Sequence, residues 1–378
     1  MLPLIYLDNS STTKPCEQAV DNIKKCLTES WGNPSSLHTV GINAELEMSA
    51  ARSAVAKALH CREDEVFFTS GGTEANNIAI MGGARSRAKR GRRIVTTAIE
   101  HPSVLNCFKE LENNGFEVVF LHPQKTGVIS EKDITDAITQ DTVLVSIMLV
   151  NNEIGSIQPV AAAAKAIKEN GAPALLHCDA VQAFGKLPID VKRLGVDMLS
   201  ISGHKIHGPK GVGALYKSKS ITLHPTVFGG GQEKGLRSGT EGVPCIAGLR
   251  GAIEALPDLN SQLKIQKELF EYTKSKLLDT GVVKINSDDE TLPYILNVSV
   301  PGYRSETLLH WLEAKNIFVS SGSACAKGST SHVLKEIGLN HHEIDSSIRI
   351  SFCRKNTKAD ADILAQEIIN ATKTLKRS

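Results

Sequence analysis

Short β-branched apolar runs alternate with helical patterns of apolar residues between about positions 15 and 217. The predicted strands are EVFFTS, RRIVTT, FEVVFL, TVLVSIMLV, ALLHCD and DMLSIS, and the predicted helices between them include 45–60 and 73–89. This alternation predicts an α/β domain with a doubly wound, mostly parallel sheet covered by helices on both faces. Ligands of such sheets bind beyond the carboxyl ends of the strands.

The pattern changes after the three glycines at 229–231. A helical pattern covers about 246–278 with a break at Pro257, and it is followed by YILNVSV, SETLLHWLEAKN, IFVSSG, SHVLKEIG, SSIRISF and a final helix at about 358–375. A chain of 378 residues exceeds what one core usually supports. We therefore expect a large domain at 15–250 and a smaller α+β domain formed by 1–14 and 251–378.

Composition excludes several classes of partner. The chain has 43 basic and 41 acidic residues, and its densest basic run, 85–93, lies where a helix is expected to end. Charge therefore predicts no direct nucleic-acid contact and no membrane contact, and the opening MLPLIYL is too short for a signal peptide. The eight cysteines show no CxxC and no regular spacing, which favours a reducing cytoplasm and predicts no disulfide framework and no metal site.

Three segments carry chemistry. The segment SGHKIHGPKG places Lys205 just past a strand, where a partly desolvated amine suits Schiff-base formation, although an exposed loop lysine is the plain alternative. The segment TSGGTEANN opens a helix after a strand and suits a phosphate, or simply caps the helix. In HCDAVQ, Asp179 ends a buried strand and needs a partner such as a pyridinium nitrogen.

Together these segments describe a pocket for pyridoxal 5'-phosphate. The amine would take the aldehyde, the helix end the phosphate, and the carboxylate the ring nitrogen. No GxxxxGK[ST] and no strand–GxGxxG–helix unit is present, so a nucleoside triphosphate or a dinucleotide fits poorly. A fourth segment, SSGSACAKGS, holds Cys325 among residues too small to bury it, which favours an accessible thiol over a packed one.

The sequence resembles the NifS/IscS-type cysteine desulfurases. The resemblance covers nearly the whole chain, through YLDNSSTT, GNPSSLH, TSGGTEANN, TTAIEHPSVL, LVSIMLVNNEIGSIQPV, HCDAVQAFGK, SGHKIHGPKG, GGGQEKGLRSGTEGVP, SSGSACA and SSIRISF. It implies a pyridoxal-phosphate enzyme of the class V aminotransferase family and of fold type I. Such a fold has a mostly parallel seven-stranded sheet in the large domain and a smaller α+β domain that carries the cysteine loop.

The resemblance also implies roles for individual residues. Lys205 would bind the cofactor aldehyde, and His101 would stack on the ring and take part in proton transfer. Asp179 would pair with the ring nitrogen. The ring hydroxyl side would face Gln182 and Asn152, and the phosphate would be held by Gly72, Thr73, Ser202 and His204. Thr240 resembles a residue given to the neighbouring subunit's phosphate, which implies a homodimer with shared sites.

The implied reaction converts L-cysteine to L-alanine and leaves a persulfide on Cys325. Arg349 would bind the substrate carboxylate bidentately, with Asn152, Asn33 and Asn9 near the substrate. Outside this family, His101 would be a capping or core residue and Arg349 an edge-strand charge. The sulfur would supply iron–sulfur clusters or thiolated tRNA and cofactors through a protein acceptor, which the resemblance does not identify.

Three rival functions share these motifs. A selenocysteine lyase could have nearly all of them, and an aminotransferase would use the same cofactor without a mobile cysteine. A sulfur carrier or scaffold that has lost turnover is the alternative from another class. Only AKGST separates Cys325 from the helical SHVLKEIG, so we expect a shorter loop, and a shorter reach to the acceptor, than in many relatives.

Overall fold

The computed structural model describes residues 4–321 and 330–377. In these ranges the larger sheet contains seven strands in the order β2-β8-β7-β6-β5-β3-β4. Their bounds are β2 Val66–Thr69, β3 Arg93–Thr97, β4 Glu117–Leu121, β5 Thr142–Ser146, β6 Leu175–Asp179, β7 Met198–Ser202 and β8 Gly213–Lys217. Strand β8 is antiparallel to both neighbours, and the other pairs are parallel. The predicted mostly parallel seven-stranded sheet is confirmed.

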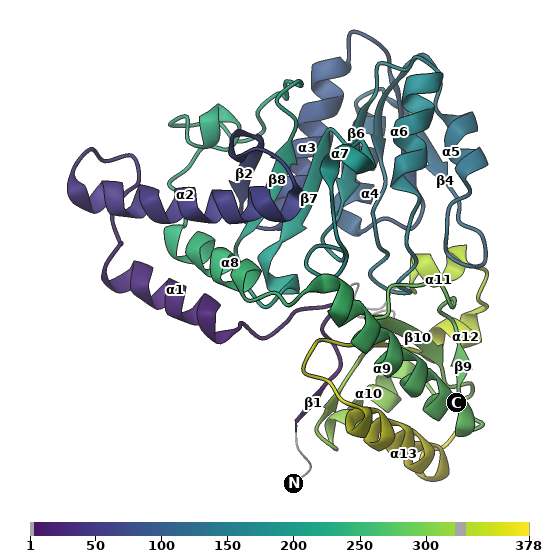
Figure 1. The fold of residues 1–378 in the computed structure, drawn as a ribbon. Helices are drawn as coiled ribbons and strands as arrows, with labels where there is room; N and C mark the ends of the chain where they lie inside the picture. Colours follow the sequence, from purple (N-terminus) through teal and green to yellow (C-terminus); the bar gives the residue numbers. More distant parts are fainter. Residues whose placement is uncertain (1–3, 322–329, 378) are drawn as a thin grey trace.

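Helices cover both faces of this sheet (Figure 1). Successive strand residues point to opposite faces, so Phe67 and Leu175 belong to one apolar cluster, and Phe68 and Leu176 to another. The first cluster includes residues of α3 (Gly72–Arg87) and α4 (Pro102–Asn113). The second includes residues of α2 (Thr39–Leu59), α5 (Glu131–Ala137), α6 (Val160–Glu169) and α7 (Val191–Leu194).

Helices α1 (Glu17–Thr28) and α8 (Val243–Glu254) extend the second cluster on the left of Figure 1. They cross closely because α8 carries glycines at the contact. A Cβ at Gly251 would lie 2.6 Å from the Gln18 carbonyl oxygen, and one at Gly248 would lie 2.8 Å from the Ile23 side chain. A larger residue at either position would push the two helices apart.

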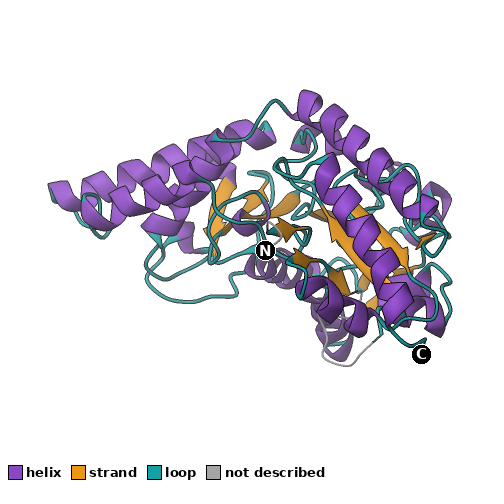
Figure 2. Ribbon diagram, turned by 90° about the horizontal axis from the view of Figure 1, so that it is seen from below, coloured by secondary structure: helices purple, strands orange, loops and turns teal. Residues whose placement is uncertain are grey.

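A smaller unit follows α8. Its sheet has the order β12-β13-β10-β9 with every pair antiparallel, and Figure 2 shows helices lying across these strands. The strands are β9 Lys284–Ile285, β10 Ile295–Ser299, β12 Ser320–Ser321 and β13 Ser347–Ser351. The helices are α9 Leu259–Asp279, α10 Ser305–Glu313, α11 His332–Glu336, α12 His341–Asp345 and α13 Lys358–Thr374.

The N-terminal segment joins this smaller unit. Strand β1 (Ile5–Tyr6) pairs in parallel with β11 (Ile317–Phe318), and Asp8 bridges to Ser351. Apolar residues of β1, α9, β10, α10, β13 and α13 form a cluster separate from that of the large sheet. The packing partner changes between α8 and α9, at the break that contains Pro257. Among the described helices, none combines the length and hydropathy needed to cross a membrane.

Candidate active site

A cavity of about 300 Å³ lies beyond the carboxyl ends of β6 and β7. Ten residues predicted for the site line it, and they come from both units: Gly72, Thr73, His101, Asn152, Asp179, Gln182, Ser202, His204, Lys205 and Arg349. Sequence reasoning missed other residues of the lining, among them Ser10, Ser11, Asn76 and Ser103. The parallel strands bring these distant segments together because their carboxyl ends share one edge of the sheet.

One end of the cavity suits an anion. Helix α3 begins at Gly72, where a Cβ would lie 2.6 Å from the Val181 side chain, so only glycine fits without a shift. The N–H groups of the first turn have no intrahelical partner, and the hydroxyls of Thr73 and Ser202 lie in the same lining. Burial, with nearby Lys205, lowers the pKa of His204 to about 4, so this imidazole is neutral near pH 7.

The carboxylate of Asp179 is buried at the end of β6. Its Oδ1 accepts from the Val181 backbone N–H at 3.0 Å, and its Oδ2 accepts from Asn76 Nδ2 at 2.7 Å. Asn76 stands one helical turn after Gly72 on α3, so its spacing from Gly72 was the sequence signal for its inward position. These two donors hold the carboxylate in place while it lines the cavity.

His101 precedes α4 and caps it. Its Nδ1 accepts from the Ser103 backbone N–H at 3.1 Å and lies 2.8 Å from Ser103 Oγ. Burial lowers the pKa of His101, Asp179 acts in the opposite direction, and Lys205 and His332 add to the lowering. The capping role and the site role are therefore compatible, because the same ring caps the helix and lines the cavity.

The amine of Lys205 contacts the N-terminal segment. It follows β7 in a single 3₁₀ turn, Gly203–Lys205, and its Nζ donates to the carbonyl oxygens of Ser10 at 2.5 Å and Ser11 at 2.8 Å. Gln182 Nε2 donates to the same Ser10 oxygen at 3.0 Å. Ser10 and Ser11 thus form one wall of the cavity, although the sequence had indicated their neighbour Asn9 instead.

A buried lysine orients Gln182. The Nζ of Lys186 donates to Gln182 Oε1 at 3.2 Å, and burial lowers the pKa of Lys186 to about 7. The Ser10 carbonyl oxygen can only accept, so the amide nitrogen of Gln182 faces Ser10 and the cavity, and its amide oxygen faces Lys186. Gln182 can therefore donate to an acceptor on the ligand.

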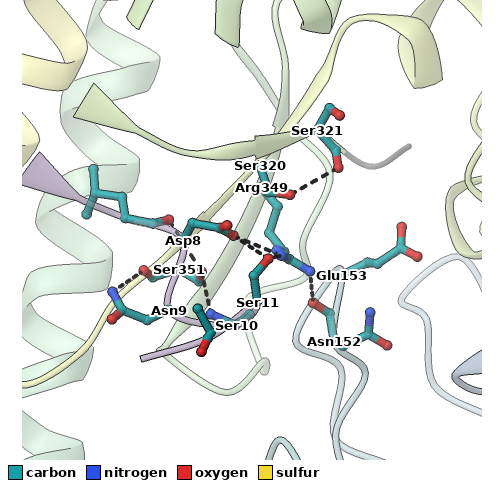
Figure 3. Close-up of polar contacts among 12 residues, drawn as sticks. Asp8, Asn9, Ser10, Ser11, Asn152, Glu153, Ser320, Ser321, Arg349 and Ser351 are labelled. Atoms are coloured by element: carbon teal, nitrogen blue, oxygen red, sulfur yellow. Dashed lines mark hydrogen bonds and ion pairs between the residues drawn. The ribbon is translucent and has the colours of Figure 1, made fainter. Parts of the chain in front are cut away.

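Arg349 lies at the centre of a polar cluster between the two units (Figure 3). Its Nη1 donates to the Asn152 carbonyl oxygen at 2.9 Å, and its Nη2 donates to Asp8 Oδ1 at 3.0 Å and Ser11 Oγ at 2.8 Å. The side chain is buried on β13, between β12 and β10, so an edge-strand solubility charge is excluded. Its buried Nε has no partner among the described residues, which leaves a donor for a ligand.

Three predicted residues lie outside this cavity lining. Asn9 is buried, and its Nδ2 donates to the Ser351 oxygen at 2.9 Å and the Tyr6 oxygen at 3.2 Å, so it braces the segment whose next two serines line the cavity. Asn33 is exposed, and its Oδ1 accepts from the Ser35 N–H at 3.0 Å. Thr240 is exposed on the loop before α8.

Cys325 lies outside the described residues, but the residues flanking 322–329 are placed. Ser320 of β12 pairs with Arg349 of β13. On the other side, Ser331 Oγ donates to Glu153 Oε2 at 2.5 Å, and Glu153 follows the Asn152 that binds Arg349. Both described flanks of this segment are therefore attached beside Arg349.

Glu100, next to His101, gives a pH-dependent prediction. Its Oε1 accepts from the Met148 N–H at 2.8 Å and from Thr97 Oγ at 2.9 Å, its Oε2 has no partner in the described ranges, and burial raises its pKa to about 8. Between the ordinary value of 4.5 and about 8, the folded chain holds a proton that the unfolded chain has lost. Its contribution to stability is therefore complete below pH 4.5 and disappears as the pH rises to about 8.

We expect Glu100→Gln to become progressively more stable relative to the parent as the pH rises through this window. The measurement is the free energy of unfolding of both proteins by denaturant titration at several pH values. The difference between the two curves isolates Glu100 from other titrating groups. A difference that stays constant from pH 4.5 to about 8 would contradict the buried, protonated carboxyl.

Comparison with known proteins agrees with this geometry. The model of the family "Aminotransferase class-V" matches residues 5–364. "Putative cysteine desulfurase IscS 1" of Bacillus subtilis (strain 168) is 43% identical over 380 residues, which cover 98% of this chain and 99% of that protein. A solved "NIFS-LIKE PROTEIN" superposes with a TM-score of 0.93 at 39% identity, covering 99% of this chain and 100% of that one.

A further solved structure, titled "SspA in complex with cysteine", has a TM-score of 0.81 at 35% identity and covers 92% of this chain and 98% of that chain. Full-length similarity at this level of identity extends over both units and over every segment that lines the cavity. The chain belongs to the class V aminotransferase family and, within it, to the IscS/NifS-type cysteine desulfurases.

Proposed function

We propose that this chain is a pyridoxal-phosphate-dependent cysteine desulfurase that converts L-cysteine to L-alanine and receives the sulfur on Cys325. The observation that carries the proposal is the meeting of Lys205, Asp179, His101 and Arg349 in one cavity. An amine, a buried carboxylate, an imidazole and a guanidinium come from four segments far apart in the chain. The relative solved with cysteine supports an amino-acid substrate of this size.

The residues present fit the cofactor that the family implies. A Cβ at Gly72 would clash with the Val181 side chain, so glycine lets the backbone approach closely here, and the α3 N-terminus with Thr73, Ser202 and neutral His204 would hold the phosphate. Asp179 would pair with the ring nitrogen, Gln182 would donate to the ring oxygen, and Lys205 would supply the amine. When bound, the cofactor would withdraw electrons from the α-carbon of the substrate.

The chain's own residues would then bind the substrate and move its protons. Arg349 would hold the cysteine carboxylate with guanidinium N–H groups that include the unpartnered Nε. Lys205 Nζ would take the proton from the α-carbon and return it. The Cys325 thiolate would attack the substrate sulfur, so that the carbon–sulfur bond breaks, a sulfur–sulfur bond forms and the electron pair remains on the β-carbon. Protonation of that carbon completes L-alanine, and the enzyme thiol becomes a persulfide.

The test uses L-cysteine alone, without an added reductant. We expect the peptide containing Cys325 to gain the mass of one sulfur atom, with one alanine formed for each persulfide in the first turnover. Peptide mass spectrometry and amino-acid analysis of the same sample measure both products. Cys325→Ala is the matched control and should show neither. If that variant still releases sulfide and alanine at the parent rate, the role of Cys325 is wrong.

We also propose a homodimer. Large apolar side chains are exposed in two places. Leu37, between α1 and α2, is 96% exposed, and Phe228, next to the three glycines at 229–231, is 81% exposed. Exposed apolar residues of this size suit an interface. Thr240 lies outside its own cavity lining, which leaves it available to a second copy. Sedimentation should give about twice the 40.7 kDa chain mass, and Phe228→Glu should shift the mass toward one chain. A parent that sediments as a single chain would contradict the proposal.

Two further expectations stay predictions. The acceptor of the sulfur is expected to be a protein, either an iron–sulfur scaffold or a tRNA-thiolation protein, and the location is expected to be the cytoplasm. The seven cysteines in the described ranges are all free thiols.

A further inference from the structure

The polar groups between Asp179 and His101 form a continuous chain of hydrogen bonds. Asn76 Nδ2 lies 2.7 Å from Asp179 Oδ2 and 2.9 Å from Ser103 Oγ, and Ser103 Oγ lies 2.8 Å from His101 Nδ1. Asn76 and Asp179 are both buried. Two residues, Asn76 and Ser103, join the two ends of this chain. Neither was predicted from the sequence to belong to the site.

The positions of the protons in this chain follow from its two ends. An ionised carboxylate can only accept, so Asn76 must turn its amino group, not its oxygen, toward Asp179. The same amino group then donates its second hydrogen to Ser103 Oγ. The buried Asn76 Oδ1, which has no partner among the described residues, is consistent with this orientation being imposed by Asp179.

At the other end, two donors point at one nitrogen of His101. The Ser103 backbone N–H, which can only donate, points at Nδ1 at 3.1 Å. The Ser103 hydroxyl accepts from Asn76 and directs its own hydrogen to the same Nδ1. A nitrogen that accepts two hydrogen bonds carries no proton, and a neutral imidazole has one N–H, so the proton of His101 is on Nε2.

We propose that Ser103 and Asn76 are positioning residues that hold His101 as the Nε2–H tautomer, so that this neutral ring presents a hydrogen-bond donor, and no basic nitrogen, to the cavity at Nε2. The inference rests on the proposed function for its consequence. Removal of the α-proton is then left to Lys205, because the neutral His101 ring offers no basic nitrogen to the cavity. The choice of the base is set by two residues that need not touch the substrate.

The charged and titratable groups around His101 act together with this geometry. Asp179 on β6 favours the protonated ring, while Lys205 after β7 and His332 on α11 disfavour it. Protonation would also place a hydrogen on Nδ1 against the Ser103 N–H, so the hydrogen bonds and the burial both favour the neutral ring. Loss of the Ser103 hydroxyl removes one of the two donors that stabilise the neutral form.

The test is nitrogen-15 NMR of the full-length, cofactor-bound protein labelled at histidine, with His101 assigned by the His101→Gln variant. At neutral pH and above, we expect Nε2 to show the shift of a protonated ring nitrogen and Nδ1 that of an unprotonated one. A proton on Nδ1 would overturn the proposal. This readout does not require turnover, so a correct tautomer without alanine formation would reject the proposed function alone.

Two substitutions at Ser103 test the positioning role. In Ser103→Ala we expect His101 to become protonated at a higher pH than in the parent, and kcat to fall about fivefold with little change in KM, which is the scale of one lost hydrogen bond. Ser103→Thr keeps the hydroxyl and should restore both values. Asn106→Ala, an exposed position on the same helix, is the control and should change neither. An unchanged protonation pH in folded Ser103→Ala would refute the role of the hydroxyl.

Discussion

Replacing Lys205 with alanine should lower the rate of alanine formation from cysteine by at least about 10³-fold, within the range seen when a general acid–base group is removed. The same change should abolish covalent attachment of the cofactor. Lys205 is the amine that extends from the end of β7 to the cavity wall, where it donates to the carbonyl oxygens of Ser10 and Ser11. Alanine can neither form a Schiff base nor carry a proton.

The measurement has two parts. Alanine formation gives the loss of turnover, and borohydride reduction followed by mass spectrometry shows whether the cofactor is bound to the chain. Lys210→Ala is the matched control, because Lys210 is an exposed lysine on the same loop. It should keep the rate and the covalent cofactor. A Lys205→Ala protein that retains a reducible covalent cofactor would show that another amine does this work.

Arg349→Ala should lower kcat/KM for cysteine by about 30-fold to about 4,000-fold, the equivalent of about 2–5 kcal/mol for truncating one partner of a buried charge pair. The guanidinium is buried on β13 and keeps an unpartnered Nε donor within the described chain. Arg349→Lys should lose much of the same activity, because a single ammonium cannot reproduce a planar fork that binds a carboxylate bidentately.

Arg349 also has a structural role, which requires a control that separates the two effects. It donates to the Asn152 carbonyl oxygen, to Asp8 and to Ser11, so its loss could loosen the contact between the two units. Cysteamine is cysteine without the carboxylate, and its binding can be followed by the cofactor absorbance. If Arg349 grips the carboxylate, parent and variant should bind cysteamine alike. Equal losses for cysteine and cysteamine would instead indicate a purely structural role.

Much of the fold could be predicted because it follows from local patterns of apolar and polar residues. The strands of the large sheet, the helix that begins at Gly72 and the final helix all lie close to the positions that the hydrophobic pattern predicts. The basic run at 85–93 does span a helix end and a strand start, since α3 ends at Arg87 and β3 begins at Arg93. Strand ends and helix starts then indicated Lys205, Asp179 and Gly72 as neighbours.

Contacts between segments that lie far apart in the sequence were harder to predict. Ser10 and Ser11 enter the cavity because β1 pairs with β11 and Asp8 bridges to Ser351, pairings that join residues over three hundred positions apart. Asn9, in the same segment, instead donates its side-chain amide hydrogens to backbone carbonyl oxygens. Which of three adjacent polar residues faces a cavity depends on the local backbone direction, and residue type alone does not predict that direction.

The amino-acid sequence by itself determined the class of fold and pointed to Lys205, Asp179 and the helix start at Gly72, because hydrophobic periodicity and strand-end motifs act over short distances. The other predicted residues that line the cavity were named through the family resemblance. Only the tertiary structure decided the hydrogen-bond partners. Asn76 faces Asp179, Lys186 turns the Gln182 amide, and Ser103 leaves the proton of His101 on Nε2. Those choices depend on which buried donor meets which acceptor across packed elements, and they exist only once the chain has folded.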